Sequence, residues 1–102
     1  MSCAAPRQGD PADTSFGTGA DGATLIDGAV GDTAGPVEGA FVRLLDRTGE
    51  FVAEVVSGPR GQFRFHVVPG QWTVRALAPG ARAEATISAV AGANWLEVRL
   101  GA

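Results

Sequence analysis

The chain has 102 residues, of which 45% are hydrophobic, and it carries a formal net charge of −3. This length suits a single domain, and the hydrophobic content excludes an intrinsically disordered chain. An acidic chain with no lysine and no basic stripe also argues against nucleic-acid binding.

Targeting signals and cysteine usage point to the cytoplasm. No run approaches the ~18 consecutive apolar residues that a membrane span needs, and the N-terminal region holds no apolar segment of the kind that a secretory signal contains. The single cysteine, Cys3, excludes an intramolecular disulfide, which fits a reducing compartment. We therefore expect a cytoplasmic protein that makes no membrane contact.

The first part of the chain differs from the rest in composition. Residues 1–22 are rich in glycine, alanine, aspartate, serine and proline and show no hydrophobic period, which is typical of a flexible segment. The sequence therefore predicts a flexible N-terminal segment over residues 1–22 and a β-sandwich domain over residues 23–102.

Seven short runs of alternating apolar and polar residues follow, and glycine or proline interrupts the chain between them. The predicted strands are residues 24–31, 40–45, 51–56, 62–67, 72–78, 82–89 and 95–100. Their spacing of ~8–12 residues predicts an all-β sandwich. No run combines a helical period with capping residues, so we expect no substantial helix.

The alternation divides the apolar residues into two sets. Phe63, Phe65 and Trp72 fall on the inward side and are expected to dominate the core because of their large apolar area. The second set falls on the side opposite the inferred core and consists of Phe41, Leu45, Leu77 and Trp95. Two interpretations of this set stay open: a surface for a protein partner or a second copy of the chain, or simple covering of edges and loops.

Glycine and proline mark four strand motifs, which are Gly28-Ala29-Val30, Pro36-Val37-Glu38-Gly39-Ala40-Phe41-Val42, Gly61-Gln62-Phe63-Arg64-Phe65 and Pro69-Gly70-Gln71-Trp72-Thr73-Val74. These motifs resemble those of the transthyretin-like, carboxypeptidase-regulatory-like domains. The resemblance covers roughly residues 24–100. It implies a seven-stranded antiparallel Greek-key β-sandwich of the transthyretin-like, or prealbumin-like, type.

A second resemblance covers nearly the whole chain. Residues 39–46, 54–56 and 72–78, together with Cys3 and the segment Pro6-Arg7-Gln8-Gly9, are similar to an actinobacterial family of unknown function. Members of that family are typically encoded beside a thiosulfate sulfurtransferase. The resemblance implies a non-enzymatic accessory that binds this sulfurtransferase, which would place the chain in sulfur metabolism.

Cys3 is the one nucleophile with any support from its surroundings. A reactive thiolate needs a nearby cation, helix N-terminus or base, and Arg7 is the only cation close in sequence. Cys3 is therefore either an ordinary thiol in a loose segment or a sulfur acceptor that carries a persulfide. A third function, binding of a carbohydrate or another small ligand through Trp95, also stays open.

Other chemistries have little support. One cysteine and one histidine cannot complete a zinc site, and the outward-facing His66 is interpreted as a solvated strand residue. No phosphate-binding loop or nucleophile elbow is present. The chain also lacks the early histidine of the hydroxyisourate hydrolases on this fold and the lysine of isopeptide-forming adhesins. We expect no catalytic residue, no cofactor and no bound metal.

Overall fold

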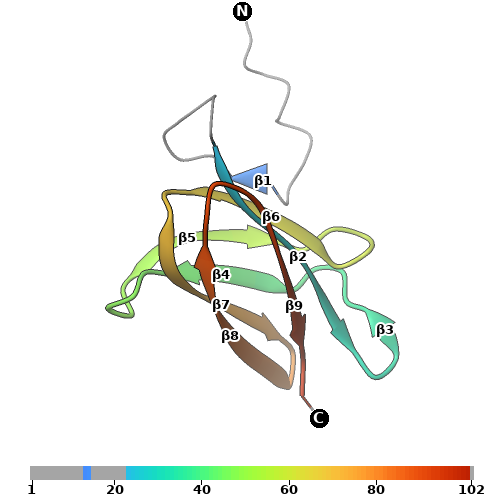
Figure 1. Cartoon of the computed structure of the whole chain (residues 1–102). Helices are drawn as coiled ribbons and strands as arrows, with labels where there is room; N and C mark the ends of the chain where they lie inside the picture. The colour runs from blue at the N-terminus through green and yellow to red at the C-terminus, as the bar shows by residue number, and fades with distance from the viewer. Residues whose placement is uncertain (1–12, 15–22, 102) are drawn as a thin grey trace, which may run out of the picture.

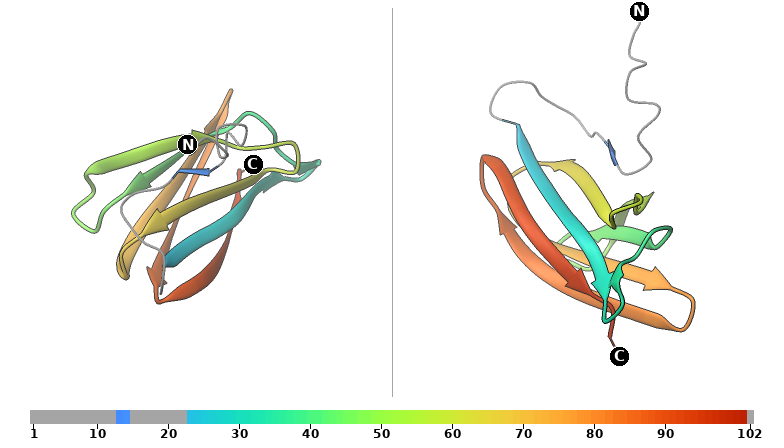
Figure 2. Two further views of the ribbon diagram at one scale, coloured as in Figure 1. Left: turned by 90° about the horizontal axis from the view of Figure 1, so that it is seen from above. Right: turned by 90° about the vertical axis from the view of Figure 1, so that its right-hand side faces the viewer.

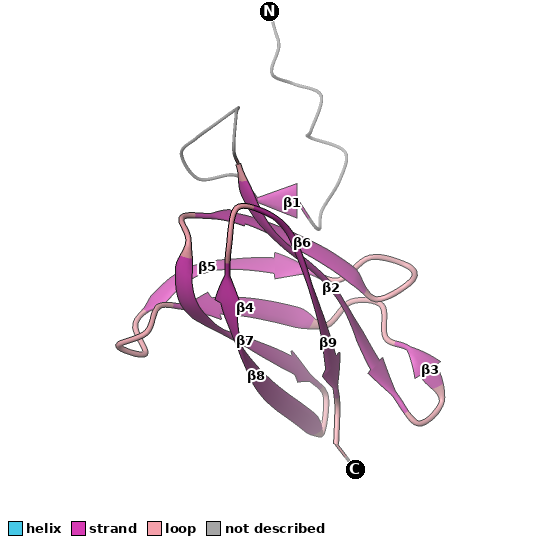
Figure 3. Cartoon of the chain, viewed as in Figure 1, coloured by secondary structure: helices cyan, strands magenta, loops and turns pink. Residues whose placement is uncertain are grey.

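The computed structural model describes residues 13–14 and 23–101. The described residues form nine strands and no helix, which confirms the predicted all-β class (Figures 1 and 3). The strands are β1 (Asp13–Thr14), β2 (Thr24–Asp32), β3 (Gly35–Pro36), β4 (Phe41–Leu45), β5 (Phe51–Val56), β6 (Gln62–Val67), β7 (Gly70–Ala78), β8 (Ala81–Ala89) and β9 (Gly92–Arg99).

Seven of these strands correspond to the seven predicted ones, and β1 and β3 are short additions. Of the segment 1–22, residues 13–14 form β1, which pairs in parallel with β6, and the other residues lie outside the described part of the chain. β3 lies in a region predicted as a turn and pairs with the end of β2.

The strands form two sheets that pack face to face as a sandwich (Figure 2). Sheet A has the order β1-β6-β2-β3, with β9 paired to the other edge of β2, and sheet B has the order β5-β4-β7-β8. The β2–β9 pair runs parallel over eight registered positions, from Thr24↔Gly92 to Gly31↔Arg99. The predicted sandwich is therefore confirmed, but this central pair departs from a purely antiparallel pattern.

The Asn94 side chain forms hydrogen bonds at the turn between β8 in sheet B and β9 in sheet A. The Asn94 side-chain amide donates to the carbonyl oxygens of Val90 and Leu25, at 2.8 and 3.0 Å, and its oxygen accepts from the Val90 N–H at 3.1 Å. These bonds tie the connecting turn to the start of β2. They also join the start of β9, where Asn94 lies, to β2.

The core lies between the sheets and is built by alternate residues of each strand. Phe63 and Phe65 are almost completely buried, and their ring centroids lie 5.9 Å apart. Trp72 also faces inward, as predicted, but it is only half-buried at the margin of the core, where its indole N–H donates to the Val68 carbonyl at 3.0 Å. The largest aromatic group therefore closes the rim of the core.

Gly28 is required by close packing in sheet A. It is the register partner of Phe63, and a Cβ atom at this position would overlap both the Phe63 ring and the Leu96 carbonyl. The strand pair β2–β9 can therefore lie against the aromatic core only because residue 28 has no side chain.

Candidate functional site

The four residues of the predicted outer apolar set do not form one surface. Phe41 and Leu77 lie together on the outer face of sheet B, whereas Trp95 projects from β9 on the outer face of sheet A. Leu45 is buried, with 5% of its surface exposed. Cys3, the candidate sulfur acceptor, lies outside the described residues.

Leu45 lies beside an irregularity in sheet B. The register between β4 and β5 shifts between Leu44 and Leu45, so that Leu44 pairs with Ala53 but Leu45 pairs with Phe51, and Val52 on β5 is left as an extra residue. The register of Leu45 with Thr73 on β7 is regular. Only 5% of the Leu45 surface is exposed, so the expectation that it contributes to an exposed apolar surface is wrong.

An apolar row crosses the outer face of sheet B. Phe41 is the register partner of Val56 on β5 and of Leu77 on β7, so the three side chains are neighbours on three adjacent strands. Phe41 is 50% exposed, Val56 is 37% exposed and Leu77 is partly buried. Arg82 on β8 pairs with Leu77 and ends the row. A half-exposed phenyl ring among aliphatic groups is the kind of cluster that marks a contact surface.

A charged row lies two residues further along the same strands. Its members in strand order are Glu54, Arg43, Arg75 and Glu84, which are register partners from β5 to β8. Arg43 Nε lies 2.7 Å from a Glu54 carboxylate oxygen, and Arg75 Nη2 lies 3.0 Å from a Glu84 carboxylate oxygen. Two like charges therefore occupy the middle of the row, and each is balanced by a glutamate on its outer side.

We call these two rows together the sheet B face. It comprises Phe41, Arg43, Glu54, Val56, Arg75, Leu77, Arg82 and Glu84. Sequence alternation predicted outward positions for Phe41 and Leu77 but did not indicate the charged row, because its four members come from four strands. Only the strand order and register of sheet B bring them into one line.

The outer face of sheet A presents a different surface. Trp95 is 66% exposed and is the register partner of Asp27, whose carboxylate accepts from Arg64 Nε at 2.6 Å. Its neighbours on this side of the sheet include Ala93 and Glu97 on β9 and Leu25 and Ala29 on β2. The Trp95 ring therefore lies beside an ion pair on a surface of mixed composition.

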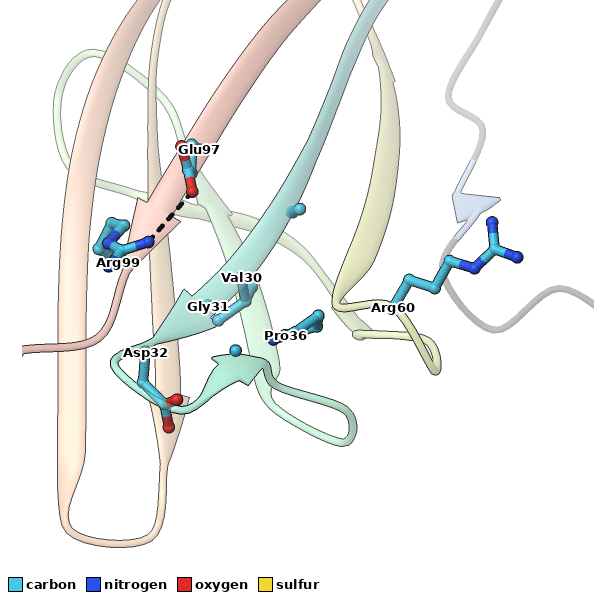
Figure 4. A pocket seen from close by; sticks show the side chains of 9 residues that line it. Val30, Gly31, Asp32, Pro36, Arg60, Glu97 and Arg99 are labelled. Atoms are coloured by element: carbon cyan, nitrogen blue, oxygen red, sulfur yellow. Dashed lines mark hydrogen bonds and ion pairs between the residues drawn. The ribbon is translucent and has the colours of Figure 1, made fainter.

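A shallow hollow of about 190 Å³ lies where β2, β3 and the end of β9 meet (Figure 4). Glu97 and Arg99 contact each other at 3.5 Å along its rim, and Arg60 extends away from the other labelled side chains. Two further hollows lie on the sheet B side, along Arg75 to Glu84 and at the β7–β8 turn. All three are open surface features and do not enclose a ligand.

Among the described residues, no cluster of three or more histidine, cysteine, aspartate or glutamate side chains could hold a metal ion. In the same part of the chain, no helix is long and apolar enough to cross a membrane. The single histidine, His66, lies on the outer side of β6 and is partly buried.

The Asp46 carboxylate has a structural role in the β4–β5 turn. One of its oxygens accepts from the Thr48 hydroxyl at 2.6 Å, from the Glu50 N–H at 3.0 Å and from the Thr48 N–H at 2.9 Å. These bonds, above all the one from the Thr48 hydroxyl, hold the pKa of Asp46 below its ordinary value. The carboxylate closes the turn, and its role is structural.

Proteins of mycobacteria are similar to this chain along most of its length. An uncharacterised protein of Mycolicibacterium smegmatis is 47% identical over 79 residues, which cover 76% of this chain and 88% of the relative. Two uncharacterised proteins of Mycobacterium tuberculosis are each 41% identical over 100 residues, which cover 96% of this chain and 98% of each relative.

Two solved structures share the fold at low sequence identity. The major pilin subunit BcpA of Bacillus cereus superimposes with a TM-score of 0.57 at 17% identity, over 78% of this chain and 30% of the pilin. The 3-chlorocatechol 1,2-dioxygenase of Rhodococcus opacus gives 0.61 at 12% identity, over 90% of this chain and 64% of the enzyme. The chain thus spans less than two thirds of either protein, and the likeness concerns the sandwich alone.

The family described as "Protein of unknown function (DUF1416)" matches residues 3–100. This range includes every strand of both sheets. The chain therefore belongs to the DUF1416 family.

Proposed function

We propose that this protein is a non-enzymatic, cytoplasmic protein-binding module and that the sheet B face is its contact surface. The observation that carries the proposal is the exposed apolar row of Val56, Phe41 and Leu77 on three adjacent strands. Aromatic residues and arginine are enriched in protein interfaces. Tryptophan, tyrosine and arginine are also enriched among the residues that contribute most of the binding energy.

The rigidity of the face supports this function. The residues next to Phe41 and Leu77 in the sequence point into the core. They are Val42 on β4 and Ala76 on β7, and both are completely buried. A contact surface carried on core strands loses little conformational entropy when a partner binds. The proposed surface is therefore preorganised.

We further propose that the partner is a thiosulfate sulfurtransferase. This part of the proposal rests on the resemblance of residues 39–46, 54–56 and 72–78 to a family that accompanies such an enzyme. The first and third of these segments contribute Phe41, Arg43, Arg75 and Leu77, and the second contributes Glu54 and Val56. The residues that carry the resemblance thus include six of the eight members of the sheet B face.

A second candidate function is ligand binding at Trp95. The observation that favours it is a 66% exposed indole beside the Asp27–Arg64 ion pair. An exposed aromatic plane with adjacent polar groups suits stacking of a sugar ring or another small ligand. The sulfur-carrier function, in which Cys3 holds a persulfide, remains an alternative that depends on a residue outside the described part of the chain.

The proposal is tested by isothermal titration of the full chain with the thiosulfate sulfurtransferase of the same organism. We expect binding by the wild type and by Cys3→Ser, and loss of binding in Phe41→Ser and in Leu77→Ser. Trp95→Ser, which removes an even more exposed aromatic group from sheet A, is the matched control and should bind normally. Loss of binding in Trp95→Ser with retention in Phe41→Ser would assign the contact to sheet A instead.

The sulfur-carrier alternative has its own readout. Mass spectrometry of the chain after incubation with thiosulfate and the enzyme would detect one added sulfur atom, about 32 Da, on a cysteine persulfide. Addition that disappears in Cys3→Ser would favour the carrier function, whereas an unmodified chain that still binds the enzyme would favour the accessory function.

A further inference from the structure

The charged row of the sheet B face contains an unusual pair. Arg43 and Arg75 are register partners on adjacent antiparallel strands, where side chains of like charge directly opposite each other are destabilising. Register partners in such strands have Cα atoms about 5 Å apart. Two arginine side chains therefore start from neighbouring backbone positions in the middle of an otherwise mixed surface.

The two glutamates use only part of the hydrogen-bonding capacity of these arginines. A guanidinium group has five N–H donors. Within the described part of the chain, Arg43 donates through Nε to Glu54, and Arg75 donates through Nη2 to Glu84. Each group therefore keeps N–H donors that its glutamate does not use. Planar donors of this kind suit a carboxylate, which can accept from both groups at once.

We infer that the sheet B face recognises an acidic and apolar segment of its protein partner, with one carboxylate between Arg43 and Arg75. This inference rests on the proposed function and specifies the chemistry of the partner. The distance between the two rows also specifies the partner segment. Phe41 precedes Arg43 by two residues, and Leu77 follows Arg75 by two. An extended partner segment that runs along the strands would therefore place a leucine on the apolar row and a glutamate, two residues away, on the arginines.

A second copy of this chain is a poorer occupant than a different protein. If the face is centred on an identical face across a two-fold axis parallel to the strands, Arg43 faces an arginine and Glu54 faces a glutamate, because the row of Glu54, Arg43, Arg75 and Glu84 reads the same in both directions. Displaced arrangements relieve this repulsion but cover less of the apolar row. Charge complementarity therefore favours a partner with an acidic centre.

The test is an NMR titration of the ¹⁵N-labelled full chain with two synthetic peptides. One is acetylated and amidated Ser-Leu-Ser-Glu-Ser, and the other replaces its glutamate by glutamine. We expect the first peptide to shift the Nε–H signals of Arg43 and Arg75 and the backbone amides of β4 and β7. The glutamine peptide should bind about threefold or more weakly, the scale of an exposed ion pair.

Variants of the charged row sharpen the test. Arg43→Gln and Arg75→Gln should weaken binding of the glutamate peptide by about threefold or more, whereas Glu84→Gln should strengthen it because it removes a competing carboxylate. Arg99→Gln, which alters a more exposed ion pair on sheet A, should leave the affinity unchanged.

The outcomes separate this inference from the proposed function. Equal affinity for the two peptides, or shifts confined to sheet A, would overturn the acidic specificity. If the sulfurtransferase still bound through Phe41 in that case, the proposed function would stand without it. Absence of any peptide-induced shift on β4 and β7 would also overturn the inference.

Discussion

Phe41 and Leu77 are register partners on β4 and β7, and both side chains leave sheet B on the side away from the core. The strands that hold them are buried on their other side, where Val42, Leu44, Val74 and Ala76 are completely enclosed. The same two strands therefore build the core on one side and present apolar groups to solvent on the other. This arrangement explains why we assign the contact surface to sheet B.

The different burial of Leu45 and Phe41 predicts different effects for two residues that sequence alternation treats as equivalent. Leu45→Ala should lower the free energy of unfolding by about 2–4 kcal/mol, because a buried side chain is lost and a cavity is left. Phe41→Ala should cost less than about 1 kcal/mol, because its side chain is already half-exposed. Urea unfolding of both variants measures the difference, and equal losses would contradict the assigned burial.

Gly28 offers a test of the packing between β2 and the aromatic core. Gly28→Ala should destabilise the domain by about 1–3 kcal/mol, because the new methyl group would overlap the Phe63 ring and the Leu96 carbonyl. Gly31→Ala is the matched control on the same strand. Its nearest neighbour would lie at 3.5 Å, an ordinary contact, so its melting temperature should stay close to that of the wild type.

Ser57 connects two segments of backbone beneath the start of β4. Its hydroxyl accepts from the Ala40 N–H at 2.9 Å and donates to the Val37 carbonyl at 2.7 Å. Ser57→Ala should cost about 1–3 kcal/mol, because both backbone groups lose a partner in a buried site. The exposed Ser88→Ala provides the control in thermal unfolding, and an unchanged melting temperature for both variants would argue against this role.

Asp46 makes the stability of the β4–β5 turn dependent on pH. Its pKa is lowered in the folded state, first by the Thr48 hydroxyl, so the ionised form contributes stability at pH values above the unfolded pKa of about 3.9. That contribution is lost as the pH falls through the lower, folded-state pKa. The stability difference between wild type and Asp46→Asn should therefore be largest near neutral pH and shrink in acid.

The carboxyl carbon of Asp46 can be titrated directly by NMR. Thr48→Ala removes the principal hydrogen bond to the carboxylate, and the pKa of Asp46 should rise toward its ordinary value. An unchanged titration in this variant would exclude the Thr48 hydroxyl as the main cause of the lowered pKa.

Local patterns in the sequence predicted the strands well. The ranges 51–56 and 62–67 coincide with β5 and β6, because glycine- and proline-marked turns fix both ends of each run. The sequence did not predict that β9 runs parallel to β2. The direction of β9 depends on how the chain crosses from one sheet to the other, and the contact of Asn94 with the Leu25 carbonyl joins residues that are far apart in the sequence.

The candidate site was predicted only in part. Phe41 and Leu77 were identified because alternation holds over both strands. Leu45 was expected to be exposed with them but is buried, because alternation gives the side of a strand on which a residue lies and not what covers it. Trp95 was grouped with them although it belongs to the other sheet. The pairing of Arg43 with Arg75 is a property of strand order, and no local pattern in either strand encodes it.

A map of amide chemical-shift changes in the ¹⁵N-labelled chain, on titration with the thiosulfate sulfurtransferase, locates the contact surface residue by residue. We expect the largest changes on β4, β5 and β7 around Phe41, Arg43 and Leu77. Amides of β2 and β9 around Trp95 should change little. Changes centred on β9, or no change at saturating enzyme, would contradict the assignment of the sheet B face as the contact surface.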